Sequence, residues 1–161
     1  MIDAQQLRRM IAYNQWADEK LLAAVDGLST DELERPREAY FVTLASNLWH
    51  MLSVQRTWLA RWKGDSVAPV EQTAIASWRA AYAASHLALR DYVGSLADAE
   101  LGRPIKFTRR DGATREQPLG QLILHLVNHG TAHRAETGLL LERLGHSPGD
   151  LDYTVFMNEV P

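Results

Sequence analysis

Four stretches of the sequence repeat apolar residues at intervals of three and four positions, and this repeat constrains the fold more than any other feature. The stretches cover about residues 4–25, 43–62, 72–96 and 118–145. Such spacing places the apolar side chains on one face of an α-helix, which turns once in about 3.6 residues. Glycine, which commonly ends a helix, comes two residues after the first and second stretches and is the last residue of the fourth. We therefore predict four long amphipathic helices.

Two shorter features lie between the predicted helices. Ser29 is followed three residues later by Glu32, which is the spacing of a capping box, so we expect a short helical turn there. Asp111-Gly112 lies between two short β-tolerant runs within residues 104–117, and this dipeptide suits the positive φ of a tight turn. We predict a small β-hairpin between the third and fourth helices.

The length and the helix count indicate a single domain over residues 1–161. A chain of 161 residues is within the usual size of one domain and long enough to bury a substantial core. Four long helices joined by intermediate connections favour an all-α fold. We expect an antiparallel four-helix bundle, with an up-down-up-down order as the simplest arrangement and the β-hairpin as an excursion from it.

Charge and composition exclude several classes of function. The formal net charge is -3, and the 17 Lys and Arg residues are scattered along the chain, which argues against a nucleic-acid partner. The sequence contains no cysteine, so thiolate metal sites and a cysteine nucleophile are excluded. The N-terminal residues lack the apolar core of a signal peptide, and no stretch approaches the ~18 apolar residues of a membrane span. We expect a soluble, cytoplasmic protein without a membrane partner.

Three of the six histidines recur at every fourth position in residues 125–136, HLVNHGTAHRAE. Residues four apart on a helix lie on neighbouring turns, so His129 and His133 can direct their rings to one point and chelate a metal ion. Four residues overshoot a full turn by about 40°, so these three rings fan across a face, and we do not expect all of them to bind one ion. A third ligand should come from another helix.

The identity of that third ligand stays open on spacing alone. We place His146 too far along the chain to meet His133, whereas His50 and His86 both fall within a few turns of His129. Histidines that only pack or face solvent are the alternative to a metal site. Burying several imidazoles without partners costs free energy, which favours the metal site.

Residues around the histidines exclude two common kinds of metal enzyme. Gly130 stands where the zinc-protease motif HExxH has its glutamate base. His133-x-x-Glu136 reverses the order of the Glu-x-x-His pairs of carboxylate-bridged di-iron bundles. Glu136 then either orients a metal ligand or pairs with a surface charge.

Three segments together resemble the DinB/YfiT-like family of metal-dependent four-helix-bundle proteins. They are YNQWADEKLL (residues 13–22), TLASNLWHMLSVQRTWLARWKG (43–64) and PLGQLILHLVNHGTAHRAETGLLLERLG (118–145). The family's three-histidine site takes one ligand from the second helix and two from the fourth. On matching positions this resemblance implies a metal site of His50, His129 and His133, with His125 beside it. The family often has His-His-Arg-Gly-Gln where this chain has Ala-His-Arg-Ala-Glu at residues 132–136, so the ligand is kept while its neighbours differ.

The resemblance implies two kinds of function. The first is a metal-dependent enzyme, either a thiol-dependent S-transferase or isomerase or a hydrolase, with an open coordination position. The cofactor would then be a divalent transition metal, Zn or Ni before Fe, with a low-molecular-weight thiol as a second cofactor, and the substrate is not indicated. The alternative is a non-catalytic stress-response bundle with a structural or sensory metal, acting through self-association or a partner. The resemblance also implies a homodimer, for which Trp49, Trp58 and Trp62 offer a face unless they pack in the core.

Overall fold

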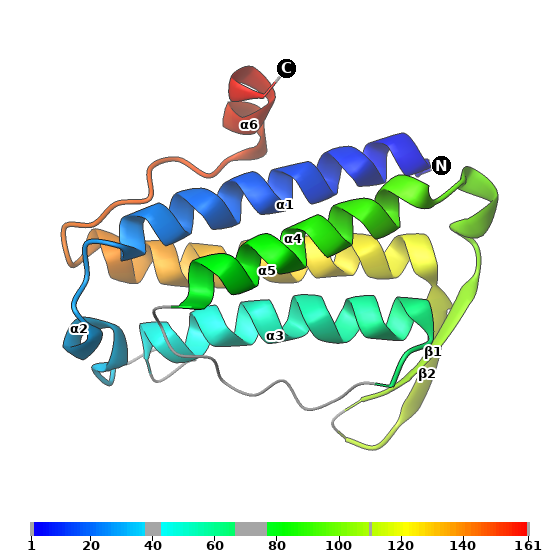
Figure 1. Ribbon diagram of the computed structural model, residues 1–161, viewed down its shortest axis with the longest axis horizontal. Coiled ribbons are helices and arrows are strands. Elements are labelled where there is room, and N and C mark those ends of the chain that lie inside the picture. The colour runs from blue at the N-terminus through cyan, green and yellow to red at the C-terminus, as the bar shows by residue number, and fades with distance from the viewer. Residues whose placement is uncertain (1, 38–42, 67–76, 110, 161) are drawn as a thin grey trace.

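The computed structural model describes residues 2–37, 43–66, 77–109 and 111–160, and it is mostly helical (Figure 1). Four long helices, α1, α3, α4 and α5, lie side by side, and the hairpin of β1 and β2 projects at one end (Figure 1). The elements in chain order are α1 (Ala4–Val25), α2 (Thr30–Glu34), α3 (Leu44–Lys63), α4 (Trp78–Ser95), a 3-10 turn η2 (Asp98–Glu100), β1 (Pro104–Thr108), β2 (Thr114–Pro118), α5 (Leu119–Glu142) and α6 (Tyr153–Glu159).

The helix ends follow the local sequence closely. The side chain of Ser29 accepts a hydrogen bond from the backbone of Glu32 and so forms the predicted capping box at α2. The helix α3 ends at Gly64, which adopts a left-handed backbone with φ 77°. The predicted first and second long helices are confirmed within one residue, and so is the hairpin, whose turn contains Gly112 at φ 79°. The predicted start of the third helix, residues 72–76, lies outside the described residues.

The four-helix bundle is confirmed, but its helix directions differ from the predicted up-down-up-down order. Tyr82 donates to the carbonyl of Leu48 (2.7 Å) near the start of α4 and α3, and Tyr92 donates to the carbonyl of Trp62 (3.1 Å) near their ends. The helices α3 and α4 are therefore parallel, whereas α1 and α5 run the opposite way (Figure 1). The observed order is up-down-down-up.

The number of residues between α3 and α4 allows this order of helix directions. The end of α3 and the start of α4 lie at opposite ends of the bundle (Figure 1). Residues 64–77 suffice to join them, because an extended chain reaches about 3.3 Å per residue and the 20 residues of α3 span about 30 Å. Although α1 and α3 are the first two long helices along the chain, they do not pack side by side. Each of them packs against both α4 and α5.

The core consists of two apolar clusters separated by a buried polar layer. One cluster, which includes Leu7 and Ile123, fills the half of the bundle next to the hairpin, and the other, which includes Leu21 and Leu48, fills the opposite half. Trp58 and Trp62 are buried in the first cluster, so the core interpretation holds for these two tryptophans. Among the described helices, none combines the length and the apolarity that crossing a membrane requires.

Candidate metal centre

Three histidine side chains from two neighbouring helices meet at the middle of the bundle. His50 comes from α3, and His129 and His133 come from successive turns of α5. His50 Nε2 lies 3.3 Å from His129 Nε2, and the ring centroid of His133 lies 4.4 Å from that of His129 and 4.8 Å from that of His50. One ring nitrogen from each histidine falls within 4.8 Å of the others. The structure thus brings together the three residues that the sequence singled out.

The geometry and charge of this group fit a divalent metal. Two nitrogens bound to one tetrahedral zinc at about 2.0–2.1 Å lie about 3.3 Å apart, which matches the separation of the His50 and His129 nitrogens. Burial, together with the charges of the neighbouring His133 and His50, lowers the pKa of His129 to about 4. At neutral pH the ring of His129 is therefore uncharged, and a neutral imidazole is the form that binds a metal.

The remaining candidate histidines have other surroundings. The ring of His125 lies one turn away on α5, 5.9 Å from His129 and edge-on to Trp58 at 5.4 Å. His86 is buried and contacts the carboxylate of Asp18 at 3.0 Å. Neither belongs to the three-histidine group. Of the two candidates that spacing left open, His50 lies in this group and His86 lies outside it.

Glu136 and Asn47 form a second row of polar groups behind His133. Glu136 Oε2 lies 3.6 Å from His133 Nδ1, an arrangement that favours a proton on Nδ1 and leaves Nε2 to bind a ligand. Burial lowers the pKa of His133, and Glu136 partly offsets this effect. Asn47 is buried and donates to Glu136 Oε2 (3.3 Å) and to Thr137 Oγ1 (2.9 Å). Glu136 was predicted as a partner for either a ligand or a surface charge, whereas Asn47 was not predicted.

A large cavity adjoins the three histidines and continues toward the hairpin. Its volume is about 1210 Å³, which exceeds the roughly 300–1,000 Å³ of most ligand pockets. Trp58, Phe107 and His125 contribute aromatic rings to its wall, and Arg61 lies beside them at the hairpin end. The metal group therefore faces a space that a small molecule can enter.

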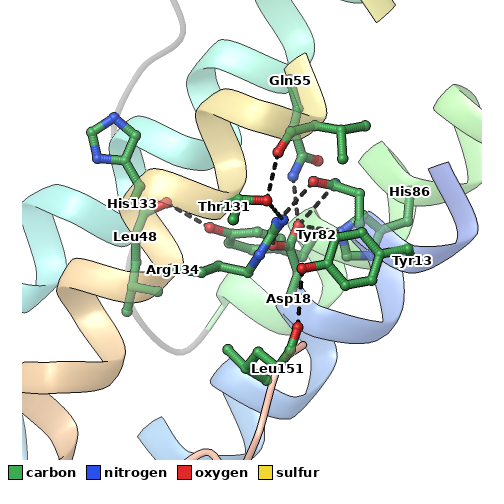
Figure 2. Close-up of polar contacts among 12 residues, drawn as sticks. Tyr13, Asp18, Leu48, Gln55, Tyr82, His86, Thr131, His133, Arg134 and Leu151 are labelled. Atoms are coloured by element: carbon green, nitrogen blue, oxygen red, sulfur yellow. Dashed lines mark hydrogen bonds and ion pairs between the residues drawn. The ribbon is translucent and has the colours of Figure 1, made fainter. Parts of the chain in front are cut away.

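A buried ion pair lies on the other side of α5 from His133 (Figure 2). Asp18 and Arg134 are 0% and 2% exposed, and their Oδ1 and Nη1 atoms lie 2.8 Å apart. Asp18 Oδ2 also accepts from Gln55 Nε2 (2.7 Å) and contacts His86 Nε2 (3.0 Å), so all four long helices contribute to one polar network. Asn14 accepts a further hydrogen bond from Arg134 at 2.8 Å.

The sequence does contain an indication of this network, because two polar residues occupy positions on the apolar face of α1. Asn14 and Asp18 are buried on the same face of α1 as Leu7, Ile11 and Leu21, at spacings of three and four. A carboxylate in such a position has to be paired, because burying an uncompensated charge is costly. The sequence pattern does not show that Arg134 is the partner of Asp18, and this pair was not predicted.

Comparisons with known proteins agree with this fold. A family model described as the DinB family matches residues 1–160. The curated "Protein DinB" of Bacillus subtilis (strain 168) is 22% identical over 158 residues, which cover 92% of each chain.

Two solved structures are similar to this one. A DinB-like protein from Bacillus cereus has a TM-score of 0.63 at 19% identity and covers 83% of this chain and 89% of its own. YfiT from Bacillus subtilis, described as a probable metal-dependent hydrolase with an unusual four-helix bundle topology, has a TM-score of 0.62 at 20% identity. This second match covers 91% of this chain and 92% of YfiT. At these identities the likeness establishes the fold.

Proposed function

Because the chain belongs to the DinB family, we propose that it is a metal-dependent enzyme whose metal is held by His50, His129 and His133. The observation that carries this proposal is the convergence of three histidine nitrogens, within 4.8 Å of one another, on the wall of a large cavity. Zinc or nickel is the expected metal, and iron follows, because three imidazoles suit all of these ions and availability decides among them.

The residues around the site have distinct roles in this proposal. Bound there, a divalent metal would lower the pKa of a coordinated water or thiol and so supply a nucleophile near neutral pH. His129 stays neutral and available because of its lowered pKa. The carboxylate of Glu136, 3.6 Å from Nδ1 of His133, would orient the ring of His133. Trp58 and the neighbouring rings of the cavity wall offer apolar contacts to a substrate.

Two reactions fit such a site. The description of YfiT as a probable metal-dependent hydrolase favours attack by water. The resemblance of the sequence to thiol-dependent transferases favours attack by a low-molecular-weight thiol on a small electrophile. Both reactions would use the same three ligands and the same adjoining cavity. Substrate tests, and not the ligand set, therefore distinguish hydrolysis from thiol transfer.

A structural or sensory metal is the alternative function. A structural site is normally closed by a fourth protein ligand. Within the described part of the chain, the group that could hold a metal consists of the three histidines, and Glu136 is not a member of it. An open position beside a cavity supports the enzyme over the structural role.

Elemental analysis of purified variants tests the metal assignment. We expect about one metal per chain in the wild type and little in His50→Ala, whereas His125→Ala should keep its metal because His125 lies outside the group. Full metal occupancy in His50→Ala would contradict the assignment. Light scattering on the same samples tests the predicted homodimer.

The metal-loaded protein is then screened against ester and amide substrates and, separately, against a chromogenic electrophile with several thiols. We expect turnover with one of these sets, lost on metal removal and in His50→Ala. Turnover that survives both changes would show that the metal is not part of the reaction.

A further inference from the structure

The cavity has a cationic end that the proposed metal chemistry does not use. We propose that Arg61 binds a carboxylate, so that the substrate is an elongated molecule with an anionic end at Arg61 and its reacting end at the three histidines. This inference rests on the proposed function for the reacting end only. The anionic end is argued from the contacts of Arg61 itself.

Arg61 is held in place by aromatic contacts that leave much of its hydrogen-bonding capacity available. Its guanidinium carbon lies 4.8 Å from the ring centroid of Trp58 and 5.6 Å from that of Phe107. One hydrogen bond, from Nη2 to the carbonyl of Thr108 (3.2 Å), ties it to β1. A guanidinium has five N–H donors in a planar fork that matches the two oxygens of a carboxylate.

Within the part of the chain that the structure describes, the charge of Arg61 has no carboxylate counterion. Partial burial lowers the pKa of the Arg61 guanidinium. Arginine stays protonated in proteins, so a half-buried positive charge faces the cavity. Arg109 and Arg115 also line this end of the cavity, but both are exposed, and Arg109 lies 3.9 Å from the carboxylate of Asp111. Arg61 is therefore the better-placed anion site.

The distance between the two ends sets the shape of the ligand. His50 and Arg61 lie on the same helix, and their separation along the axis is about 16 Å at about 1.5 Å per residue. Trp58 and His125, whose ring centroids lie 5.4 Å apart, form the wall between these ends. A ligand that reaches both ends needs an apolar middle part. Glu136 adds negative charge at the histidine end, so a carboxylate is favoured at Arg61 and disfavoured beside the histidines.

The test compares two thiols of equal length that differ at one end. Mercaptoundecanoate carries a carboxylate and mercaptoundecanol a neutral hydroxyl, and calorimetry gives their affinities for the zinc-loaded protein. A charge-assisted bidentate contact should make the wild type prefer the carboxylate about tenfold or more. Arg61→Met should remove this preference while leaving the affinity for mercaptoundecanol unchanged.

Arg56→Met is the matched control. Arg56 belongs to the same helix but contacts the carbonyl of Ala81 (3.5 Å) and does not line the cavity. The substitution Arg56→Met removes the same charge as Arg61→Met, but from a side chain outside the cavity. The preference for the carboxylate should therefore persist in Arg56→Met. Equal affinities in the wild type, or a preference that persists in Arg61→Met, would overturn the proposal. If methionine prevents folding, Arg61→Gln tests the same point, because it keeps a donor for the carbonyl of Thr108.

A second pair of probes separates this inference from the proposed function. Undecanoate and undecanol lack the thiol and are titrated into metal-free protein, where only the anionic end is tested. A preference for undecanoate that depends on Arg61, in a protein that binds no metal, would support the anion site and refute the proposed function. Metal binding that depends on His50, without any preference for a carboxylate, would refute the anion site and leave the proposed function standing.

Discussion

Replacing Asp18 by Asn should destabilise the bundle strongly, because it removes the charge that compensates Arg134. Both side chains are buried, at 0% and 2% exposure, and their charged atoms lie 2.8 Å apart. Asparagine keeps the shape and the acceptor oxygen but leaves the guanidinium without a counterion. Breaking one side of a buried ion pair typically costs about 3–5 kcal/mol. That is a large fraction of the roughly 5–15 kcal/mol by which a domain is stable.

Urea and thermal unfolding measure this loss directly. For a chain of this length each kcal/mol shifts the melting temperature by about 2–4 °C, so the melting temperature of Asp18→Asn should fall by roughly 6–20 °C. Asp26→Asn, at the C-terminal cap of the same helix, is the matched control. Asp26 also pairs with an arginine, Arg79, but both side chains are more than half exposed, so its loss should cost about 0–1 kcal/mol. Equal losses in the two variants would refute the reasoning.

The same carboxylate predicts how stability depends on pH. Burial raises the pKa of Asp18, but the charge of Arg134 and the hydrogen bond from His86 outweigh burial, so the net pKa lies below its ordinary value. A group with a depressed pKa stabilises the folded state above its unfolded pKa of about 3.9, and this contribution is lost as pH falls through the folded pKa. The stability difference between the wild type and Asp18→Asn should therefore shrink below about pH 4. A difference that stays constant down to pH 2 would contradict this.

Two further substitutions test the packing and the site. Gly130→Ala should destabilise the fold by about 1–3 kcal/mol in urea, because a Cβ there would lie 2.7 Å from Arg134 Nη1, whereas Gly94→Ala, in open space on α4, should gain up to about 1 kcal/mol. Equal effects would show that the close approach at Gly130 is unimportant. Glu136→Gln should weaken zinc binding about tenfold or more in competition with a chelator, because the amide holds His133 less well than the carboxylate. Unchanged affinity would remove Glu136 from the site.

Local features of the sequence were sufficient to predict most of the helices. Ser29 and Glu32 cap α2 as expected, because a capping box involves only residues three apart. The hairpin turn at Gly112 follows for the same reason, since a positive φ is a local demand. The direction of α4 was predicted wrongly, because apolar periodicity is the same whichever way a helix runs. The short helix α6 was not predicted, since its seven residues carry too little periodicity.

One part of the candidate site was predictable from the spacing of the histidines, and another part from the resemblance to a known family. His129 and His133 share a helix, so their convergence followed from helix geometry alone. His50 required the family resemblance, because the packing of α3 against α5 is a long-range property. Asp18 was missed because it lies far along the sequence from Arg134, and only the folded bundle joins them.

Anomalous diffraction from crystals of the zinc-loaded protein tests the central claim most directly. We expect one strong peak about 2.0–2.1 Å from a ring nitrogen of each of His50, His129 and His133, with the cavity side free of any further protein ligand. A peak elsewhere in the molecule, or a site closed by the carboxylate of Glu136, would contradict it.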